Sequence, residues 1–275
     1  MQFALELVLA GTCFATALVC CAGSWYSILA TRIGIGAAVA RYGVGSLTNS
    51  FLPGRAGDVV RVGLFGRIVP GGVVAVAGAA ATVGAVRWFA LMPLGIAGML
   101  GSTIPPVALL AAAVALLPLP VVWILARRGS RRACTALAPL RDASRRTFGL
   151  VFAWVCGTLA ARVAGVAITA AALGVPHPLA AALLVVPAME LAGVLPLLPA
   201  NAGFAGGAAA VAFHAEGAPM HAALAAGFIV HAVETGTAIA IGSASVVALL
   251  RAGVRIRPRR PSPVRHPTFA EPLPM

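Results

Sequence analysis

Four charged side chains stand inside hydrophobic stretches of this sequence. Two are arginines, Arg87 and Arg162, and two are carboxylates, Glu190 and Glu234. A charged group at the middle of a bilayer costs about 2.5–3.5 kcal/mol on insertion scales, so such groups usually face protein or water. Together they can line a cavity of both charge signs, suited to a phosphate headgroup with or without an attached amine. The alternative is structural: two ion pairs, Arg87–Glu234 and Arg162–Glu190, that hold helices together.

A second polar cluster surrounds a proline-glycine break and contains Asn49, Arg55, Asp58 and Arg61. Asp58 and Arg61 are three residues apart and can pair on one face of a helix. The planar guanidinium of Arg55 can bind a lipid phosphate. Snorkelling of Arg55 to the membrane interface is the alternative explanation. In an enzyme, Asp58 and Glu190 would be the carboxylates available for proton transfer.

The sequence predicts neither a metal nor a cofactor. His231 and Glu234 are two potential metal ligands on one helix face, but a metal site needs at least one more convergent ligand. The chain has no lysine and therefore no G-x-x-x-x-G-K-[ST] loop for a nucleotide. The five cysteines show no C-x-x-C spacing, and we expect them to behave as small hydrophobic residues.

The chain that carries these residues has the amino-acid composition of a membrane protein. Hydrophobic residues make up 60% of the chain and charged residues only 10%, whereas about a quarter of a soluble domain is charged. The long apolar runs do not alternate as β-barrel strands do. We therefore predict an all-α, polytopic helical membrane protein. The net charge of +13 comes from arginines clustered between apolar segments, as in cytoplasmic loops, so we expect lipids and not nucleic acid as partners.

The apolar segments divide the chain into two similar halves within an integral membrane domain of residues 1–250. Crossing about 30 Å of hydrocarbon takes about 20 helical residues. Segments of that length are predicted at 3–29, 73–99, 148–173 and 220–250. A linking helix at 107–125 and a basic cytoplasmic loop at 127–146 separate repeat one (about 3–100) from repeat two (about 148–250). The basic, proline-rich tail at 251–275 is expected to be disordered and cytoplasmic.

Each half also contains a shorter apolar segment that is interrupted. The first breaks at Pro53-Gly54, and the second is predicted to break at Pro187, Pro196 and Pro199. The nine residues FLPGRAGDV from Phe51 recur in altered form as LLPANAGFA 146 positions later. Paired breaks of this kind are typical of inverted-topology repeats with a site at their interface. We predict that the two breaks approach each other near the midplane of the bilayer.

The positions of the arginines predict the topology. No basic residue precedes the first span, so the N-terminus is expected outside, with the 127–146 loop and the tail inside. The first interrupted hairpin would then open to the inside and the second to the outside.

The segment from Asn49 to Arg61 resembles the first motif of the lysylphosphatidylglycerol synthase transmembrane-region family. That motif has an Asn, a Pro-Gly-Arg-Ala-Gly-Glu/Asp core and a following Arg. Trp25 and Arg87 match further positions of the family, and residues 195–203 resemble a degenerate copy of the family's second motif. The resemblance covers about residues 20–250 and implies a flippase-type membrane domain. In the best-known members this region is fused to a soluble synthase and translocates aminoacylated phospholipid; we expect no synthase domain here.

We therefore expect a multi-pass protein of the bacterial inner membrane that binds and translocates an anionic phospholipid or a polyprenyl-phosphate lipid. The predicted headgroup-binding residues are Asn49, Arg55, Asp58, Arg61, Arg87, Arg162, Glu190, Asn201 and Glu234. The alternative is a membrane-embedded transferase, or an accessory subunit, in lipid-linked glycan or phospholipid modification. A separate synthase or glycosyltransferase is a further expected partner. A structural scaffold is the third hypothesis.

Overall fold

A computed structural model describes residues 1–29, 33–52, 55–100, 143–193 and 202–254 of the chain, and every regular element within these ranges is an α-helix. The helices are α1 (Gln2–Leu29), α2 (Ile35–Phe51), α3 (Ala56–Gly66), α4 (Gly72–Leu100), α8 (Arg145–Ala172), α9 (Pro178–Ala192), α10 (Ala202–Ala215) and α11 (Met220–Arg251). The predicted fold class, an all-α polytopic membrane protein, is confirmed.

Four of these helices are long and apolar enough to cross a membrane: α1, α4, α8 and α11. They coincide with the spans predicted at 3–29, 73–99, 148–173 and 220–250. Large hydrophobic side chains such as Phe3, Phe152 and Phe228 are exposed on them, as expected of helices that face lipid. The predicted linking helix at 107–125 and most of the basic loop and of the tail lie outside the described residues.

The other four helices are short and occur as two pairs, where the sequence predicted interrupted segments. Helices α2 and α3 have 17 and 11 residues, and α9 and α10 have 15 and 14. At 1.5 Å per residue none of them reaches across about 30 Å of hydrocarbon. One detail of the prediction is wrong: Pro187 does not break its segment, because α9 continues through it to Ala192. Transmembrane helices tolerate proline where neighbouring groups satisfy the freed carbonyl.

Local sequence determines where several of these helices begin. The hydroxyl of Ser144 caps α8 by accepting the N–H of Thr147 at 3.1 Å, which satisfies one free donor of the first turn. Helices α3 and α9 both follow a residue in the left-handed region, Arg55 (φ 56°) and His177 (φ 49°). Pro178 then supplies a helical φ at the first position of α9. These sharp turns redirect the chain into each short helix.

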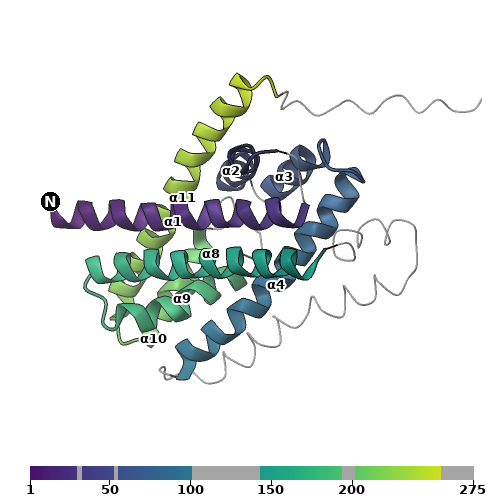
Figure 1. Ribbon diagram of the computed structural model, residues 1–275. Helices are drawn as coiled ribbons and strands as arrows, with labels where there is room; N and C mark the ends of the chain where they lie inside the picture. Colours follow the sequence, from purple (N-terminus) through teal and green to yellow (C-terminus); the bar gives the residue numbers. More distant parts are fainter. Residues whose placement is uncertain (30–32, 53–54, 101–142, 194–201, 255–275) are drawn as a thin grey trace, which may run out of the picture.

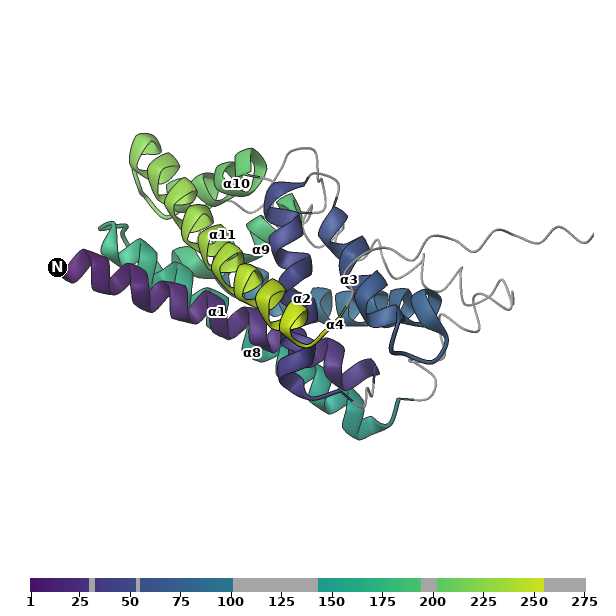
Figure 2. The ribbon, with the colours of Figure 1, turned by 90° about the horizontal axis from the view of Figure 1, so that it is seen from above.

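The helices pack in a pattern that repeats between the two halves (Figures 1 and 2). Each half runs long, short, short, long: α1 to α4 in the first and α8 to α11 in the second. The long helices α1 and α8 lie side by side between the halves. Helix α2 packs on α11 of the other half, and its counterpart α9 packs on α4. Likewise α3 packs on α4 as α10 packs on α11.

Small residues bring several of these helices into close contact. A Cβ added at Gly23 of α1 would lie 2.6 Å from the ring of Trp154 on α8. In the second half, a Cβ at Gly227 of α11 would overlap the carbonyl oxygen of Gly206 on α10. Small residues at helix interfaces allow the close backbone approach that supports packing within membranes, where no hydrophobic driving force acts between helices.

We expect Gly57→Ala to destabilise the contact between α2 and α3. A Cβ at Gly57 would overlap the carbonyl oxygen of Gly45 and meet the Asn49 amide, and overpacking of this kind costs about 1–3 kcal/mol. The melting temperature in detergent should fall by several degrees. Gly63→Ala is the matched control, because a Cβ at Gly63, on the same helix, meets open space. Equal melting temperatures for the two variants would contradict the prediction.

Candidate functional site

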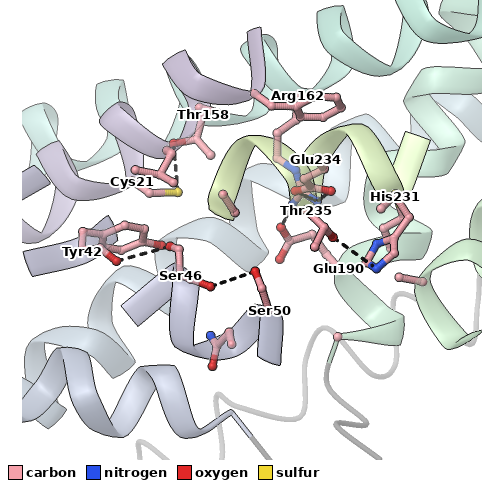
Figure 3. A pocket seen from close by; sticks show the side chains of 18 of the residues that line it. Cys21, Tyr42, Ser46, Ser50, Thr158, Arg162, Glu190, His231, Glu234 and Thr235 are labelled. Carbon is pink, nitrogen blue, oxygen red and sulfur yellow. Dashed lines mark hydrogen bonds and ion pairs between the residues drawn. The ribbon is translucent and has the colours of Figure 1, made fainter. Parts of the chain in front are cut away.

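The four charged residues predicted inside apolar segments meet between α4, α8, α9 and α11. Arg162 of α8 donates a hydrogen bond to Glu190 of α9 and forms an ion pair with Glu234 of α11 at 2.8 Å. Arg87 of α4 lies 3.6 Å from the other oxygen of Glu190. Figure 3 shows Arg162 reaching the two carboxylates, with Thr235 and His231 beside them. One arginine is therefore shared by two carboxylates from different helices.

Of the two ion pairs predicted as the structural alternative, Arg162–Glu190 is present and Arg87–Glu234 is not. Arg87 instead faces Glu190, because α4 packs on α9. Its guanidinium also donates a hydrogen bond to the Sγ of Cys21 on α1, at a distance of 2.7 Å. Cys21 in turn lies 3.6 Å from the hydroxyl of Thr158 on α8. Sequence reasoning treated Cys21 as a small hydrophobic residue, and no spacing signal links it to Arg87, 66 residues away.

The first-motif residues form a second, connected cluster. Arg61, only 6% exposed, pairs with Asp58 at 2.6 Å, as the i, i+3 spacing predicted. Its Cζ lies 3.8 Å from the ring centroid of Tyr42 and 5.7 Å from that of Trp25, and its Nη2 donates to Ser46. Arg61 is thus buried among aromatic rings, and it joins α1, α2 and α3.

Asn49 and Arg55 hold the first break in place. Asn49 accepts the backbone N–H of Gly57 at 2.7 Å, across the break between α2 and α3. Arg55 donates through Nε and Nη2 to the carbonyl of Gly193, at 3.1 and 2.7 Å. Gly193 ends α9, where the second break begins. The approach of the two breaks stays a prediction, because Pro53, Pro199 and Asn201 lie outside the described residues.

Two cavities adjoin at the centre of these clusters. The smaller, of about 310 Å³, is lined by Arg162, Glu190 and Glu234 together with polar side chains such as Ser50 and Thr235 (Figure 3). The larger, of about 460 Å³, adds Asp58, Arg61 and apolar side chains including Val83 and Val155. Shared by both walls are Cys21, Tyr42, Asn49, Arg55, Arg87, Thr158 and Gly193. Both volumes lie in the range typical of small-ligand sites.

The charges on these walls favour an anion. Their cations are Arg55, Arg61, Arg87 and Arg162, and their anions are Asp58, Glu190 and Glu234. Each of these three carboxylates has an arginine nitrogen within 3.6 Å, whereas Arg55 hydrogen-bonds a backbone carbonyl. Arg55 and Arg87 both stand at the junction of the cavities. The described residues hold no group of three potential metal ligands.

Long apolar helices, two pairs of short helices and a cavity lined by charged side chains between them define a multi-pass integral membrane protein. The family model described as "Lysylphosphatidylglycerol synthase TM region" matches residues 4–242, which is most of the 275-residue chain. The chain belongs to this family. No curated protein and no solved structure matches it significantly.

Proposed function

We propose that the protein binds an anionic phospholipid or a polyprenyl-phosphate lipid and translocates it across the bacterial cytoplasmic membrane. The observation that carries this proposal is the position of Arg55 and Arg87 at the junction of two cavities within an apolar helical protein. Guanidinium groups bind phosphate oxygens through two parallel hydrogen bonds. The headgroup would exchange its hydration for these contacts, while the hydrocarbon chains stay against the exposed apolar faces of the helices.

The matching order and packing of α1–α4 and α8–α11 support an inverted-repeat arrangement, in which rocking of one repeat against the other exposes the site to each side in turn. The proposed topology places the N-terminus outside and the 127–146 loop inside. Arg55 belongs to the first repeat and its partner Gly193 to the second. The proposed headgroup site therefore lies at the interface between the repeats.

Translocation should depend on both junction arginines. We expect Arg55→Ala and Arg87→Ala each to slow leaflet exchange of a labelled anionic lipid at least tenfold, because a hydrogen bond to a charged group contributes about 1.5–3 kcal/mol. The measurement is quenching of the labelled lipid from one side of proteoliposomes. Arg251→Ala, at the exposed end of α11, is the matched control. Exchange at the wild-type rate in both arginine variants would refute the proposal.

The transferase alternative is favoured by Asp58, which lines the larger cavity and keeps 40% of its side chain exposed. Such an enzyme, or an accessory subunit of a separate synthase or glycosyltransferase, would convert the lipid as well as bind it. Chemical analysis of the lipids from the same vesicles distinguishes the two functions. Conversion that is lost in Asp58→Asn supports the transferase, and exchange without conversion supports the translocator.

A further inference from the structure

The charges lining the two cavities point to a more specific ligand, on the basis of the proposed function. We infer that the headgroup carries one negative charge, on a phosphodiester, and that its remaining part is uncharged and hydroxylated. Phosphatidylglycerol and a polyprenyl-phosphate sugar both have this chemistry.

The first argument is electroneutrality. With His231, which also lines the smaller cavity, counted as neutral, four guanidinium groups and three carboxylates give the combined cavity walls a net charge of +1. An uncompensated charge is costly where the surroundings have a low dielectric constant. A monoanionic headgroup makes the occupied cavity neutral. A phosphomonoester, with a charge of −1.5 to −2 near pH 7, leaves it negative, and a zwitterionic headgroup leaves it at +1.

The second argument concerns the carboxylates, which are already paired. Arg162 contacts both Glu190 and Glu234, and Arg87 lies near the second oxygen of Glu190. A ligand ammonium bound there would have to compete with Arg162, whose side chain is only 12% exposed. Displacing Arg162 would leave a buried guanidinium without its counter-ions, which is strongly destabilising. The smaller cavity is therefore not built to receive a cationic group.

The remaining walls of the smaller cavity suit hydroxyl groups. Ser46, Ser50 and Thr235 present hydroxyls there (Figure 3), and Asn49 also lines this cavity. A hydroxyl oxygen has two lone pairs, so Ser50 can accept a ligand hydroxyl while it donates to the carbonyl of Ser46. A glycerol or sugar unit offers both donors and acceptors to such a wall.

The phosphate position follows from the junction of the two cavities. Arg87 is 3.6 Å from its carboxylate partner and Arg55 binds a carbonyl, so both can turn toward a phosphate without breaking a close ion pair. From this point the hydroxylated group extends into the smaller cavity. The ester oxygen on the other side points into the larger cavity, which Val62, Val83 and Val155 line in part, and the hydrocarbon continues from there to the exposed apolar faces of the helices.

A lipid panel in proteoliposomes tests the inference. It contains two monoanionic diesters (phosphatidylglycerol and a polyprenyl-phosphate hexose), two monoesters (phosphatidic acid and polyprenyl monophosphate) and zwitterionic phosphatidylethanolamine. We expect at least one diester to exchange tenfold faster than every monoester and zwitterion. The diester that exchanges faster shows whether the ligand is a phospholipid or a polyprenyl lipid. Equal or faster exchange of a monoester or zwitterion would overturn the inference while leaving the proposed function intact. Exchange of no lipid would overturn the proposed function itself.

A change in cavity charge gives a second test. Glu234→Gln raises the charge of the walls from +1 to +2, so the ratio of phosphatidic acid binding to phosphatidylglycerol binding should rise at least tenfold in competition measurements. Asp58→Asn makes the same change at a more exposed position and serves if the first variant does not fold. Glu6→Gln, in the first turns of α1 where Gln2 hydrogen-bonds the carboxylate, removes a carboxylate outside the cavities and is the control. An unchanged ratio in the folded variant would refute the electroneutrality argument.

Discussion

Arg162→Gln is expected to lower the free energy of unfolding by about 3 kcal/mol or more, because removing one partner of a buried ion pair leaves the other uncompensated. Here two carboxylates would lose their shared partner, since Arg162 pairs with both Glu190 and Glu234. Only Arg87 would remain, 3.6 Å from Glu190. Unfolding by denaturant in detergent micelles, followed by circular dichroism, measures the effect.

The charge explanation is tested by removing all three groups together. The triple variant Arg162→Gln, Glu190→Gln, Glu234→Gln removes both orphaned carboxylates and leaves only Arg87, whose side chain is 25% exposed, without its carboxylate partner, so we expect it to recover part of the lost stability. Arg146→Gln, at the exposed start of the same helix, should leave stability unchanged. A triple variant as unstable as the single one would show that packing, and not charge, explains the loss.

Arg61→Ala should have an effect of similar size, about 3 kcal/mol. The substitution removes the ion pair to Asp58, the contact with the Tyr42 ring and the hydrogen bond to Ser46. A desolvated cation over an aromatic ring contributes about 2 kcal/mol, and Asp58 would lose its partner as well. The melting temperature and the fluorescence of the neighbouring Trp25 should both report the loss of contact between α1, α2 and α3.

Arg61→Lys separates charge from shape in the same measurement. Lysine keeps the charge near Asp58 but lacks the planar group that stacks on Tyr42, so we expect an intermediate stability. Arg251→Ala provides the exposed control. If Arg61→Ala melts at the temperature of this control, Arg61 does not hold the three helices together.

The helices were predictable because the physical signal for them is local. A helix such as α1 needs only a long apolar run, and the predicted span 3–29 differs from the observed Gln2–Leu29 by one residue. The two short pairs followed from proline and glycine in otherwise apolar segments. Pro187 misled the prediction because its effect depends on neighbouring helices, which can satisfy the carbonyl that proline leaves free.

The partners within the site were less predictable, since they depend on which helices meet. The sequence identified Arg87, Arg162, Glu190 and Glu234 as informative, but the ion pair Arg87–Glu234, offered as the structural alternative, is not the one that forms. The packing of α4 on α9 makes Glu190 the partner of Arg87. The contact of Cys21 with Arg87 likewise joins residues from α1 and α4, and it leaves no trace in the spacing of either segment.

The short helices α2, α3, α9 and α10 have a consequence for the electric field across the membrane. A cleft that opens to water between such short helices and has low-dielectric walls focuses field lines, so more of the potential would fall across the two cavities. A headgroup of charge −1 that crosses the full potential changes in energy by about 2.3 kcal/mol per 100 mV. This energy corresponds to a change of about 50-fold in the ratio of the headgroup populations on the two sides. With the cytoplasm negative, the membrane potential alone would drive the proposed monoanionic headgroup outward.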